Sequence, residues 1–305
     1  MSGSRTTRCA FVALVGAPNV GKSSLLNRLV GTKVSIVSPK PQTTRRRIMG
    51  ITVRGDTQLC FVDTPGIFAA AGKLEKAMVE AAWRAAGDAD LVVVVLDAKR
   101  GLDSKSRAVI EGLRGTGKPT LLAINKIDLV KPPALLPLTA EANALLPFVE
   151  TFYLSAETGE GVEELLASLE ARAPAGPWLF PEDQLSDLSN RAMAAEITRE
   201  KIFLQLREEV PYATTVETEQ WVESLDGKEI RIDQTIYVEK PGQKAIVIGK
   251  GGARLKAIGE AARADLEALL GARVHLFLFV KVREGWKEDP ERWRELGLEP
   301  PGRSR

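Results

Sequence analysis

The chain has 305 residues, of which 44% are hydrophobic and 27% charged, and at roughly 100 to 200 residues per domain this length favours two domains. The composition is that of an ordinary globular protein, and no unbroken apolar run, neither Cys9 to Val15 nor Leu91 to Leu96, approaches the roughly 20 residues that a membrane-spanning helix needs. With two cysteines and a single histidine, His275, the sequence argues against a disulfide framework, a histidine triad or a two-histidine metal site, and it favours a reducing compartment.

The net charge of +2 conceals an uneven distribution along the chain. Residues 1–175 hold 22 Lys and Arg against 17 Asp and Glu, whereas residues 176–305 hold 20 against 23. Within the second part, residues 240–283 carry nine basic side chains against three acidic ones. A nucleic-acid surface leaves such a local excess in a sequence, although a solvated face leaves the same pattern.

Residues 10–172 alternate apolar runs of strand length with amphipathic helical stretches. Continuous apolar runs belong to strands that are covered on both faces, so we expect an α/β domain with a mostly parallel sheet. The predicted strands are Ala10–Gly16, Ile48–Val53, Leu59–Val62, Leu91–Asp97, Thr120–Asn125 and Phe148–Leu154.

A glycine-rich loop follows the first predicted strand and precedes a helix. Its sequence, Gly16-Ala17-Pro18-Asn19-Val20-Gly21-Lys22-Ser23 followed by Ser24, matches the pattern G-x-x-x-x-G-K-[ST] of the phosphate-binding P-loop. Glycines let the backbone N–H groups curl around phosphate oxygens, and the helix N-terminus adds partial positive charge. We expect Lys22 to reach the β- and γ-phosphates and the Ser23 hydroxyl to ligate Mg²⁺.

Three further loops at strand ends predict a guanine nucleotide. Asp63-Thr64-Pro65-Gly66 places a carboxylate for Mg²⁺ and a glycine N–H for the γ-phosphate. Asn125-Lys126-Ile127-Asp128 offers a carboxylate to the N1–H and exocyclic amine of guanine, a donor pair that adenine lacks, so it selects GTP over ATP. Ser155-Ala156-Glu157 then offers a backbone N–H to the guanine oxygen.

A polar stretch between the P-loop and the Asp63 motif contains two adjacent threonines. In GTP switches a threonine here binds Mg²⁺ and orders only while the γ-phosphate is present, and we favour Thr44 over Thr43 for that role. The catalytic candidates are therefore Lys22, Thr44, Asp63 and Gly66. We interpret the triplet Arg45–Arg47 as an RNA or protein contact rather than as a catalytic arginine finger.

The segment Ala173-Pro-Ala-Gly-Pro177 breaks the α/β pattern and predicts a linker to a second domain. Beyond it the sequence predicts, in order, a helix over Ser189–Leu206, strands over Tyr212–Val222 and Glu229–Val238, a glycine loop over Gly249–Gly252, a helix over Ala253–Leu270 and a strand over Val274–Val282.

The glycine loop of the second domain has the G-x-x-G pattern with which KH domains clamp a nucleic-acid backbone. Small residues let phosphates approach the helix N-terminus, and a basic residue such as Lys250 neutralises them. The candidate RNA-binding residues are Gly249, Lys250, Gly251, Gly252, Arg254 and Lys256. On the last predicted strand, His275, Phe277 and Phe279 are assigned to packing rather than to base stacking.

Together these motifs resemble the translation-factor-related GTPases, and Gly16–Ser24, Pro41-Gln-Thr-Thr-Arg45 and Asp63–Gly66 are similar to the Era family. The resemblance covers about Cys9 to Gly297. It implies a P-loop GTPase domain at 1–175, a linker and leading helix at 176–200, an α+β type II KH domain at 201–285 and a C-terminal segment at 286–305.

The resemblance also implies ligands and partners. The cofactors are GTP or GDP with Mg²⁺ held by Ser23, Thr44 and Asp63, and K⁺ held by Asn19. The position after Gly66, where many small GTPases have a glutamine that orients water, is Ile67, which implies slow hydrolysis. The implied target is 16S rRNA near its 3′ end, with a role in assembly of the 30S subunit.

Two other interpretations remain open. In one, the chain is a signalling GTPase whose C-terminal domain docks proteins or a membrane surface. In the other, it is an ATP-dependent kinase that shares only the P-loop, which the motif Asn125–Asp128 opposes. We expect a cytoplasmic monomer and leave open a peripheral fraction at the inner membrane.

Overall fold

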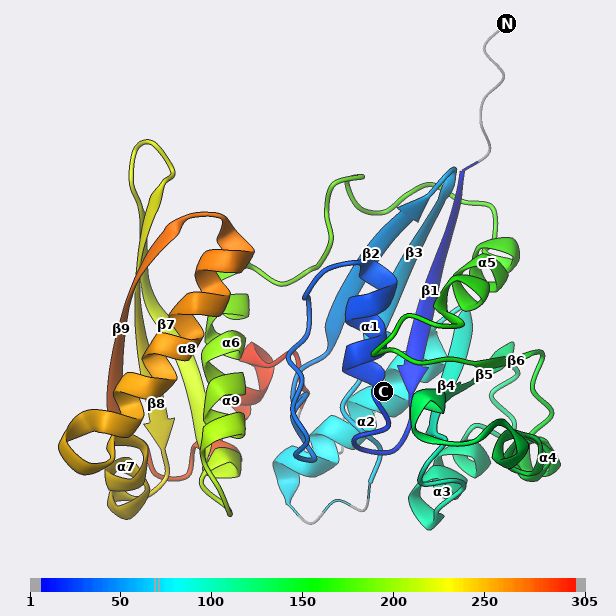
Figure 1. Cartoon of the computed structure of the whole chain (residues 1–305), viewed down its shortest axis with the longest axis horizontal. Coiled ribbons are helices and arrows are strands. Elements are labelled where there is room, and N and C mark those ends of the chain that lie inside the picture. The colour runs from blue at the N-terminus through cyan, green and yellow to red at the C-terminus, as the bar shows by residue number, and fades with distance from the viewer. Residues whose placement is uncertain (1–6, 69, 71, 300–305) are drawn as a thin grey trace, which may run out of the picture. The chain divides into compact units, whose positions relative to one another are not determined.

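The structure is a computed structural model that describes residues 7–68, 70 and 72–299 (Figure 1). By their contacts the described residues form two compact units. The first unit contains residues up to 35, residues 44–187 and residues from 293 onward, and the second contains residues 36–43 and 188–292. The chain therefore passes from one unit to the other more than once, and residues 36–43 belong with the second unit although they precede most of the first.

The first unit is built on a six-stranded sheet in the order β2-β3-β1-β4-β5-β6. Only the pairing of β2 with β3 is antiparallel, and the other neighbours are parallel. Every residue of β4 is buried, as its continuous apolar sequence predicts for a strand covered on both faces. The strands are β1 (Arg8–Val15), β2 (Ile48–Arg54), β3 (Thr57–Asp63), β4 (Leu91–Asp97), β5 (Thr120–Asn125) and β6 (Thr151–Tyr153).

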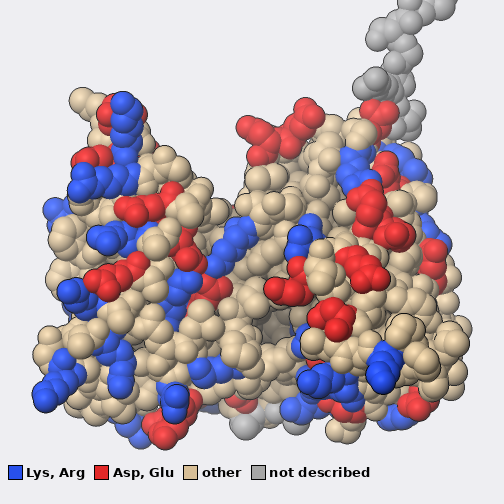
Figure 2. Space-filling model, in the orientation of Figure 1, with Lys and Arg blue, Asp and Glu red and all other residues tan. Residues whose placement is uncertain are grey.

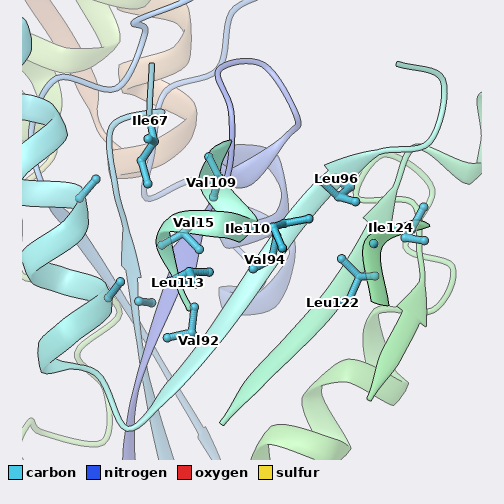
Figure 3. Packing of buried hydrophobic residues seen from close by; sticks show 14 of the residues in the cluster. Val15, Ile67, Val92, Val94, Leu96, Val109, Ile110, Leu113, Leu122 and Ile124 are labelled. Carbon is cyan, nitrogen blue, oxygen red and sulfur yellow. The ribbon is translucent and has the colours of Figure 1, made fainter. Parts of the chain in front are cut away.

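Helices lie on both faces of this sheet (Figure 1). They are α1 (Lys22–Val30), α2 (Lys73–Asp88), α3 (Ser104–Gly112), α4 (Leu135–Leu145) and α5 (Val162–Arg172). Apolar side chains from α2, α3 and α4 pack against one face of β1, β4 and β5 (Figure 3). This arrangement leaves the carboxyl ends of the parallel strands, where the predicted nucleotide motifs begin, at one edge of the sheet.

The second unit is a three-stranded sheet, β7-β8-β9, with helices α6 and α8 packed on one face. Strands β7 and β8 are antiparallel and β8 and β9 are parallel, and α8 lies between β8 and β9 in sequence. The elements are α6 (Asn190–Gln205), β7 (Thr214–Glu223), β8 (Glu229–Val238), α7 (Pro241–Ile248), α8 (Ala253–Leu270), β9 (Arg273–Val282) and α9 (Pro290–Glu295), of which α9 extends past residue 292.

The predicted fold class, a mostly parallel α/β GTPase domain followed by an α+β KH domain, is confirmed. The strand predicted at Phe148–Leu154 is only Thr151–Tyr153. The helix α7, which precedes the glycine loop, has no counterpart among the predicted elements. Pro241 at its first position and Gln243, whose side-chain oxygen accepts the Lys240 N–H, favour that helix.

The domain limits predicted at 175, 200 and 285 stay predictions, and residues 300–305 of the C-terminal segment lie outside the described part. The predicted linker is tied to the first unit, since the Gly176 N–H donates to the Thr7 carbonyl and Ala175 pairs with Arg8. Among the described residues, no helix is both long enough and apolar enough to cross a membrane.

Candidate nucleotide and RNA sites

The P-loop connects the end of β1 to the start of α1, and its glycines are required by close contacts. Gly21 has φ = 97°, in the left-handed region, and a Cβ there would lie 2.3 Å from the Asn125 side-chain nitrogen. A Cβ on Gly16 would lie 2.6 Å from the Val95 carbonyl oxygen. Any larger residue at either position would therefore push the loop away from the neighbouring strand ends.

Lys22 is buried at the first position of α1. Its ammonium donates to the carbonyls of Gly16 and Ala17, each at 3.1 Å, so the lysine lies across the P-loop of which it is part. Burial lowers the pKa of Lys22 to about 8, and the charge of Asp63 acts in the opposite direction. A phosphate group entering the loop would supply the negative charge that favours the protonated lysine.

Three hydroxyl groups surround the carboxylate of Asp63 at the end of β3. Asp63 Oδ2 accepts from Ser23 Oγ at 2.7 Å and from Ser35 Oγ at 3.1 Å, and Thr44 Oγ1 lies 3.5 Å from it and 2.9 Å from Ser23 Oγ. The other oxygen, Asp63 Oδ1, is buried and has no hydrogen-bond partner among the residues that the structure describes. Burial raises the pKa of Asp63, and the nearby Lys22 charge opposes that shift. A carboxylate and hydroxyls with an unused buried oxygen fit Mg²⁺, which prefers oxygen ligands.

The structure separates the two threonines that the sequence places side by side. The Thr43 hydroxyl donates to the Lys40 carbonyl at 2.7 Å and contacts Ser38 Oγ, whereas the Thr44 hydroxyl joins Ser23 and Asp63. The geometry thus favours Thr44, the residue preferred from the sequence. The arginine triplet that follows is not one exposed patch, because Arg45 is buried while Arg47 is exposed.

The loop after β3 carries no polar side chain at the position following Gly66. Ile67 is buried against the core formed with α2 and α3, as Figure 3 shows, and its N–H donates to the Gly16 carbonyl at 3.2 Å. A Cβ on Gly66 would lie 2.9 Å from Pro18, so the loop packs tightly on the P-loop. The Ile67 side chain therefore cannot orient a water molecule over the nucleotide site.

Asn125 joins the P-loop to the loop that contains Ala156. Its side-chain nitrogen donates to the Val20 carbonyl and its side-chain oxygen accepts the Ala156 N–H, each at 2.9 Å. The next residue, Lys126, donates to the Asn19 carbonyl and to Asp97 Oδ2, each at 2.7 Å. The predicted base-binding and phosphate-binding motifs are therefore held in one hydrogen-bonded arrangement.

Several residues that brace this site were not identified from the sequence. Asp97 at the end of β4 pairs with Lys126, and Ser35 contacts Asp63. Arg28 of α1 donates to the carbonyls of Ala156 and Glu157. The position of Asp97 at a strand end was a usable signal, but nothing in the sequence marks Ser35 or Arg28, because their partners lie far along the chain.

In the second unit, the G-x-x-G loop lies between α7 and α8. Gly249, Gly251 and Gly252 have φ values of 73°, 56° and 81°, all in the left-handed region that favours glycine. Beside the loop is a groove of about 430 Å³ between α8 and β9. It is lined by Gly252, Leu255, Lys256, Gly259, Glu260, Arg263, Leu276 and Leu278.

The two predicted basic contacts after the loop differ in their surroundings. Lys256 lines the groove, with Glu260 at 3.9 Å, whereas the Arg254 guanidinium donates to the Ile246 carbonyl at 2.7 Å at the end of α7. Blue basic side chains gather around the part of this unit where α7 lies (Figure 2). The groove is thus lined by apolar side chains, two of them from β9, and by two basic residues of α8 beside one acidic residue.

The packing role predicted for Phe277 and Phe279 is wrong. Their exposed fractions are 46% and 53%, because they point to the opposite face of β9 from Leu276 and Leu278. The Arg231 guanidinium lies 4.9 Å from the Phe277 ring centre. The alternation of residues along β9 predicted that the strand has two faces, but it did not show which of the two faces the helices cover.

The fold and these two sites define a P-loop GTPase joined to a KH domain. Residues 11–126 match the family of 50S ribosome-binding GTPases, and residues 209–287 match the KH domain family. GTPase Era of Bradyrhizobium sp. strain BTAi1 is 55% identical over 97% of this chain and 96% of its own length, and GTPase Era of Brucella suis is 53% identical over 97% and 94%.

Solved structures agree with the sequence relatives. A crystal structure of Era with MgGDPNP and nucleotides 1506–1542 of 16S rRNA matches with a TM-score of 0.90 and 40% identity, over 95% of this chain and 99% of that one. A crystal structure of a variant of Aquifex aeolicus Era bound to GDP and AlF₄⁻ matches with a TM-score of 0.90 and 39% identity over the same shares. The chain belongs to the Era family of GTPases, which confirms the resemblance and the enzymatic activity predicted from the sequence.

Proposed function

We propose that the chain is a slow, GTP-hydrolysing switch that binds the 3′ part of 16S rRNA and acts in assembly of the 30S subunit. The observation that carries the proposal is the groove beside Gly249–Gly252, which is lined in part by Lys256 and Arg263 and belongs to the same chain as a guanine-nucleotide site. The relative with 40% identity was solved with nucleotides 1506–1542 of 16S rRNA, which supports this class of target.

The nucleotide site supports binding of GTP with Mg²⁺. Ser23, Thr44 and Asp63 would hold the ion, which, when bound, neutralises charge on the β- and γ-phosphates. Lys22 holds a phosphate charge at the loop, and Asp128 would accept the two guanine donors. Because Ile67 is buried, a backbone group or another element must position the attacking water, which is consistent with slow hydrolysis.

The remaining parts of the proposal concern a monovalent cation, the oligomeric state and the place of the protein in the cell. Asn19, whose carbonyl accepts from Lys126 and whose backbone has φ = 64°, would hold K⁺ beside the phosphates. We place the protein in the cytoplasm as a monomer that acts on the 30S subunit. A peripheral fraction at the inner membrane is part of the same proposal.

The test compares two glycine variants in the second unit. Gly252→Asp puts a carboxylate at the start of α8, where phosphates would approach, and Gly271→Asp puts one at the far end of the same helix. Both glycines have positive φ, 81° and 63°, and neither Cβ would lie within 4 Å of another atom in the described part of the chain, so both variants carry a similar backbone cost of about 1 kcal/mol.

We expect Gly252→Asp to weaken binding of an RNA with nucleotides 1506–1542 of 16S rRNA about tenfold or more, through loss of phosphate contacts. Gly271→Asp should bind like the wild type, and both should hydrolyse GTP normally. Equal RNA binding by the wild type and both variants would show that RNA does not bind at the groove. A wild-type chain that binds no RNA, with GDPNP or with GDP, would favour the protein-docking or membrane-docking GTPase.

A further inference from the structure

The two faces of strand β9 have different surroundings. Its even-numbered residues from Val274 to Val280 pack with the helices of the second unit or line the groove. Its odd-numbered residues lie on the opposite face, where Phe277 and Phe279 are 46% and 53% exposed. No other aromatic side chain in the described part of the chain is as exposed as these two. Packing within the unit therefore does not account for the two rings.

An arginine of the neighbouring strand β8 is fixed beside these rings. Arg231 Nε and Nη2 donate to the two carboxylate oxygens of Asp233, each at 2.9 Å, and these bonds hold the pKa of Asp233 below its usual range. The Arg231 guanidinium lies 4.9 Å from the Phe277 ring centre, and its side chain is 55% exposed. The pair thus holds a flat, charged group in one orientation, with the donors of Nη1 not used by Asp233.

The charge that β9 adds to this face is positive. The strand contains Arg273, His275 and Lys281 and no acidic residue. Arg273 Nη1 and His275 Nε2 lie 3.7 and 3.4 Å from the carboxylate of Glu229. Lys281, two positions beyond Phe279, is exposed and makes no ion pair with a described residue. Because alternate residues share a face, this edge strand presents two rings and then a free cation in one line (Figure 1).

Residues 283–292 cover only one end of this face. The Arg283 guanidinium lies 3.5 Å from the Tyr237 ring centre, and Arg283 and Arg292 pair with Glu217 at 2.7 and 3.2 Å. Tyr237 is 6% exposed as a result. The cover does not extend to the two phenylalanine rings, so a ligand can reach them without displacing any part of this unit.

Exposed rings, a fixed guanidinium and a free lysine suit single-stranded RNA. Unpaired bases stack on aromatic rings and on guanidinium planes, while lysines neutralise the backbone. The two rings are two residues apart, about 6.7 Å along the strand, which is roughly twice the rise between stacked bases. Each ring can therefore take one base that is separated from the next. A protein partner also favours exposed aromatic residues, but it has no need of a strand with basic side chains and no acidic ones.

The position of these rings next to the groove favours RNA as well. Leu276 and Leu278 line the groove, and the rings lie on the other side of the same edge strand. A G-x-x-G loop clamps about four nucleotides. The RNA solved with the relative of 40% identity spans nucleotides 1506–1542, so most of an RNA of that length must lie outside such a groove.

We propose that Phe277, Phe279 and Arg231 form a second RNA-binding surface, the phenylalanine face, which stacks unpaired bases that flank the nucleotides in the groove. Lys281 neutralises the phosphates of the same segment. This inference rests on the proposed RNA binding by the second unit and adds to it a site and a class of ligand, unpaired bases.

The experiment measures the affinity of the full chain, loaded with GDPNP, for an RNA with nucleotides 1506–1542 of 16S rRNA. Phe279→Leu keeps an apolar side chain but removes the flat ring, and it should weaken binding about fivefold or more, the loss expected for one stacked base. Phe277→Leu should act in the same direction. Phe279→Trp keeps a flat ring and should bind the RNA at least as tightly as the wild type.

The matched control is Val222→Ala. Val222 lies on β7 of the same sheet and is 57% exposed, so it also removes exposed apolar surface, and it should leave the RNA affinity unchanged. Unchanged affinity in both Phe277→Leu and Phe279→Leu would overturn the inference, as would an equal loss in Val222→Ala. Variants that bind the RNA normally but bind purified 30S subunits more weakly would assign the phenylalanine face to a protein partner and overturn it too.

Photocrosslinking locates the contact directly. The same RNA with 5-iodopyrimidines in place of its pyrimidines should crosslink to Phe277 or Phe279, which mass spectrometry of the digested protein identifies. Crosslinks confined to residues that line the groove would contradict the second surface.

The outcomes also separate this inference from the proposed function. If Gly252→Asp weakens RNA binding and the two leucine variants do not, only the inference fails. If Phe279→Leu weakens binding and Gly252→Asp does not, the groove fails as the RNA site and the phenylalanine face stands. A wild-type chain that binds no RNA removes both.

Discussion

Single residues at the nucleotide site have their ionisation set by burial rather than by ion pairs. Lys22 is buried at the start of α1 and contacts two carbonyls, and the carboxylate of Asp63 is buried among hydroxyl groups. Burial lowers the pKa of the lysine and raises that of the aspartate, because each charged form loses solvation. Binding of a charged ligand at this site is therefore coupled to the uptake or release of protons by these two side chains.

We predict that nucleotide binding takes up a proton above neutral pH. In the free protein the pKa of Lys22 falls from 10.5 to about 8, and bound phosphates should return it toward its ordinary value. GDP binding should then take up nearly one proton at about pH 9 and about a tenth of one at pH 7. Calorimetry at each pH, in two buffers with different ionisation enthalpies, measures the uptake.

The same shift fixes the direction of two pH effects. Between about pH 8 and 10.5 the unfolded chain binds more protons at Lys22 than the folded chain, so this residue's contribution to the stability of the free protein rises with pH. Nucleotide affinity should fall over that window, because the protonated lysine becomes harder to form. An affinity that stays constant from pH 7 to 9.5 would contradict the lowered pKa.

Among the elements, the ones predicted best are those with continuous apolar runs or glycine motifs. Strands β4, β5 and β8 and helix α8 have the predicted bounds, since a run bounded by turn residues fixes both type and length. Helix α7 was missed because its apolar run is too short to show helical periodicity. The nucleotide motifs are contiguous, so they could be recognised from the sequence. Contacts to backbone carbonyls, such as those of Arg28, leave no pattern in the sequence.

Two helical glycines in the first unit predict opposite effects of one substitution. Gly87 near the end of α2 has open space around its Cβ position, so Gly87→Ala should stabilise the protein by about 0.5 kcal/mol through the unfolded chain's entropy. At Gly112, the last residue of α3, a Cβ would lie 2.3 Å from the Trp83 ring, so Gly112→Ala should destabilise by about 1–3 kcal/mol.

Chemical denaturation of the two variants beside the wild type measures both changes. The pair is its own control, because the substitution and the kind of element are the same and only the neighbouring ring differs. Destabilisation by both variants would mean that α2 does not continue as a regular helix through residue 87.

Over the whole molecule, RNA binding should depend on where the basic side chains lie rather than on the net charge. The chain has a net charge of only +2, while residues 240–283 hold nine basic side chains against three acidic ones. Association with RNA should therefore depend on a few residues near the G-x-x-G loop, and it should weaken with salt as counterions return to the phosphates.

The predicted test is a salt titration of RNA affinity with two lysine variants. Lys250→Gln, in the G-x-x-G loop, should lower the slope of log affinity against log salt by about 0.7, the value for one phosphate contact on a single strand. Lys228→Gln changes the same charge at the turn between β7 and β8, where the side chain is 81% exposed, and should leave the slope unchanged. Equal slopes for both variants would show that Lys250 does not contact a phosphate.

The bridge made by Asn125 limits how this site can be altered, in evolution or by design. Its one amide group supports the P-loop through Val20 and the base-side loop through Ala156, and Gly21 leaves room for it. Exchanging the Asn125–Asp128 motif to accept another base would therefore also disturb the loop that grips the phosphates. A redesign of base preference that keeps Asn125 and changes only Asp128 should retain phosphate binding, whereas a transplant of the whole motif should not.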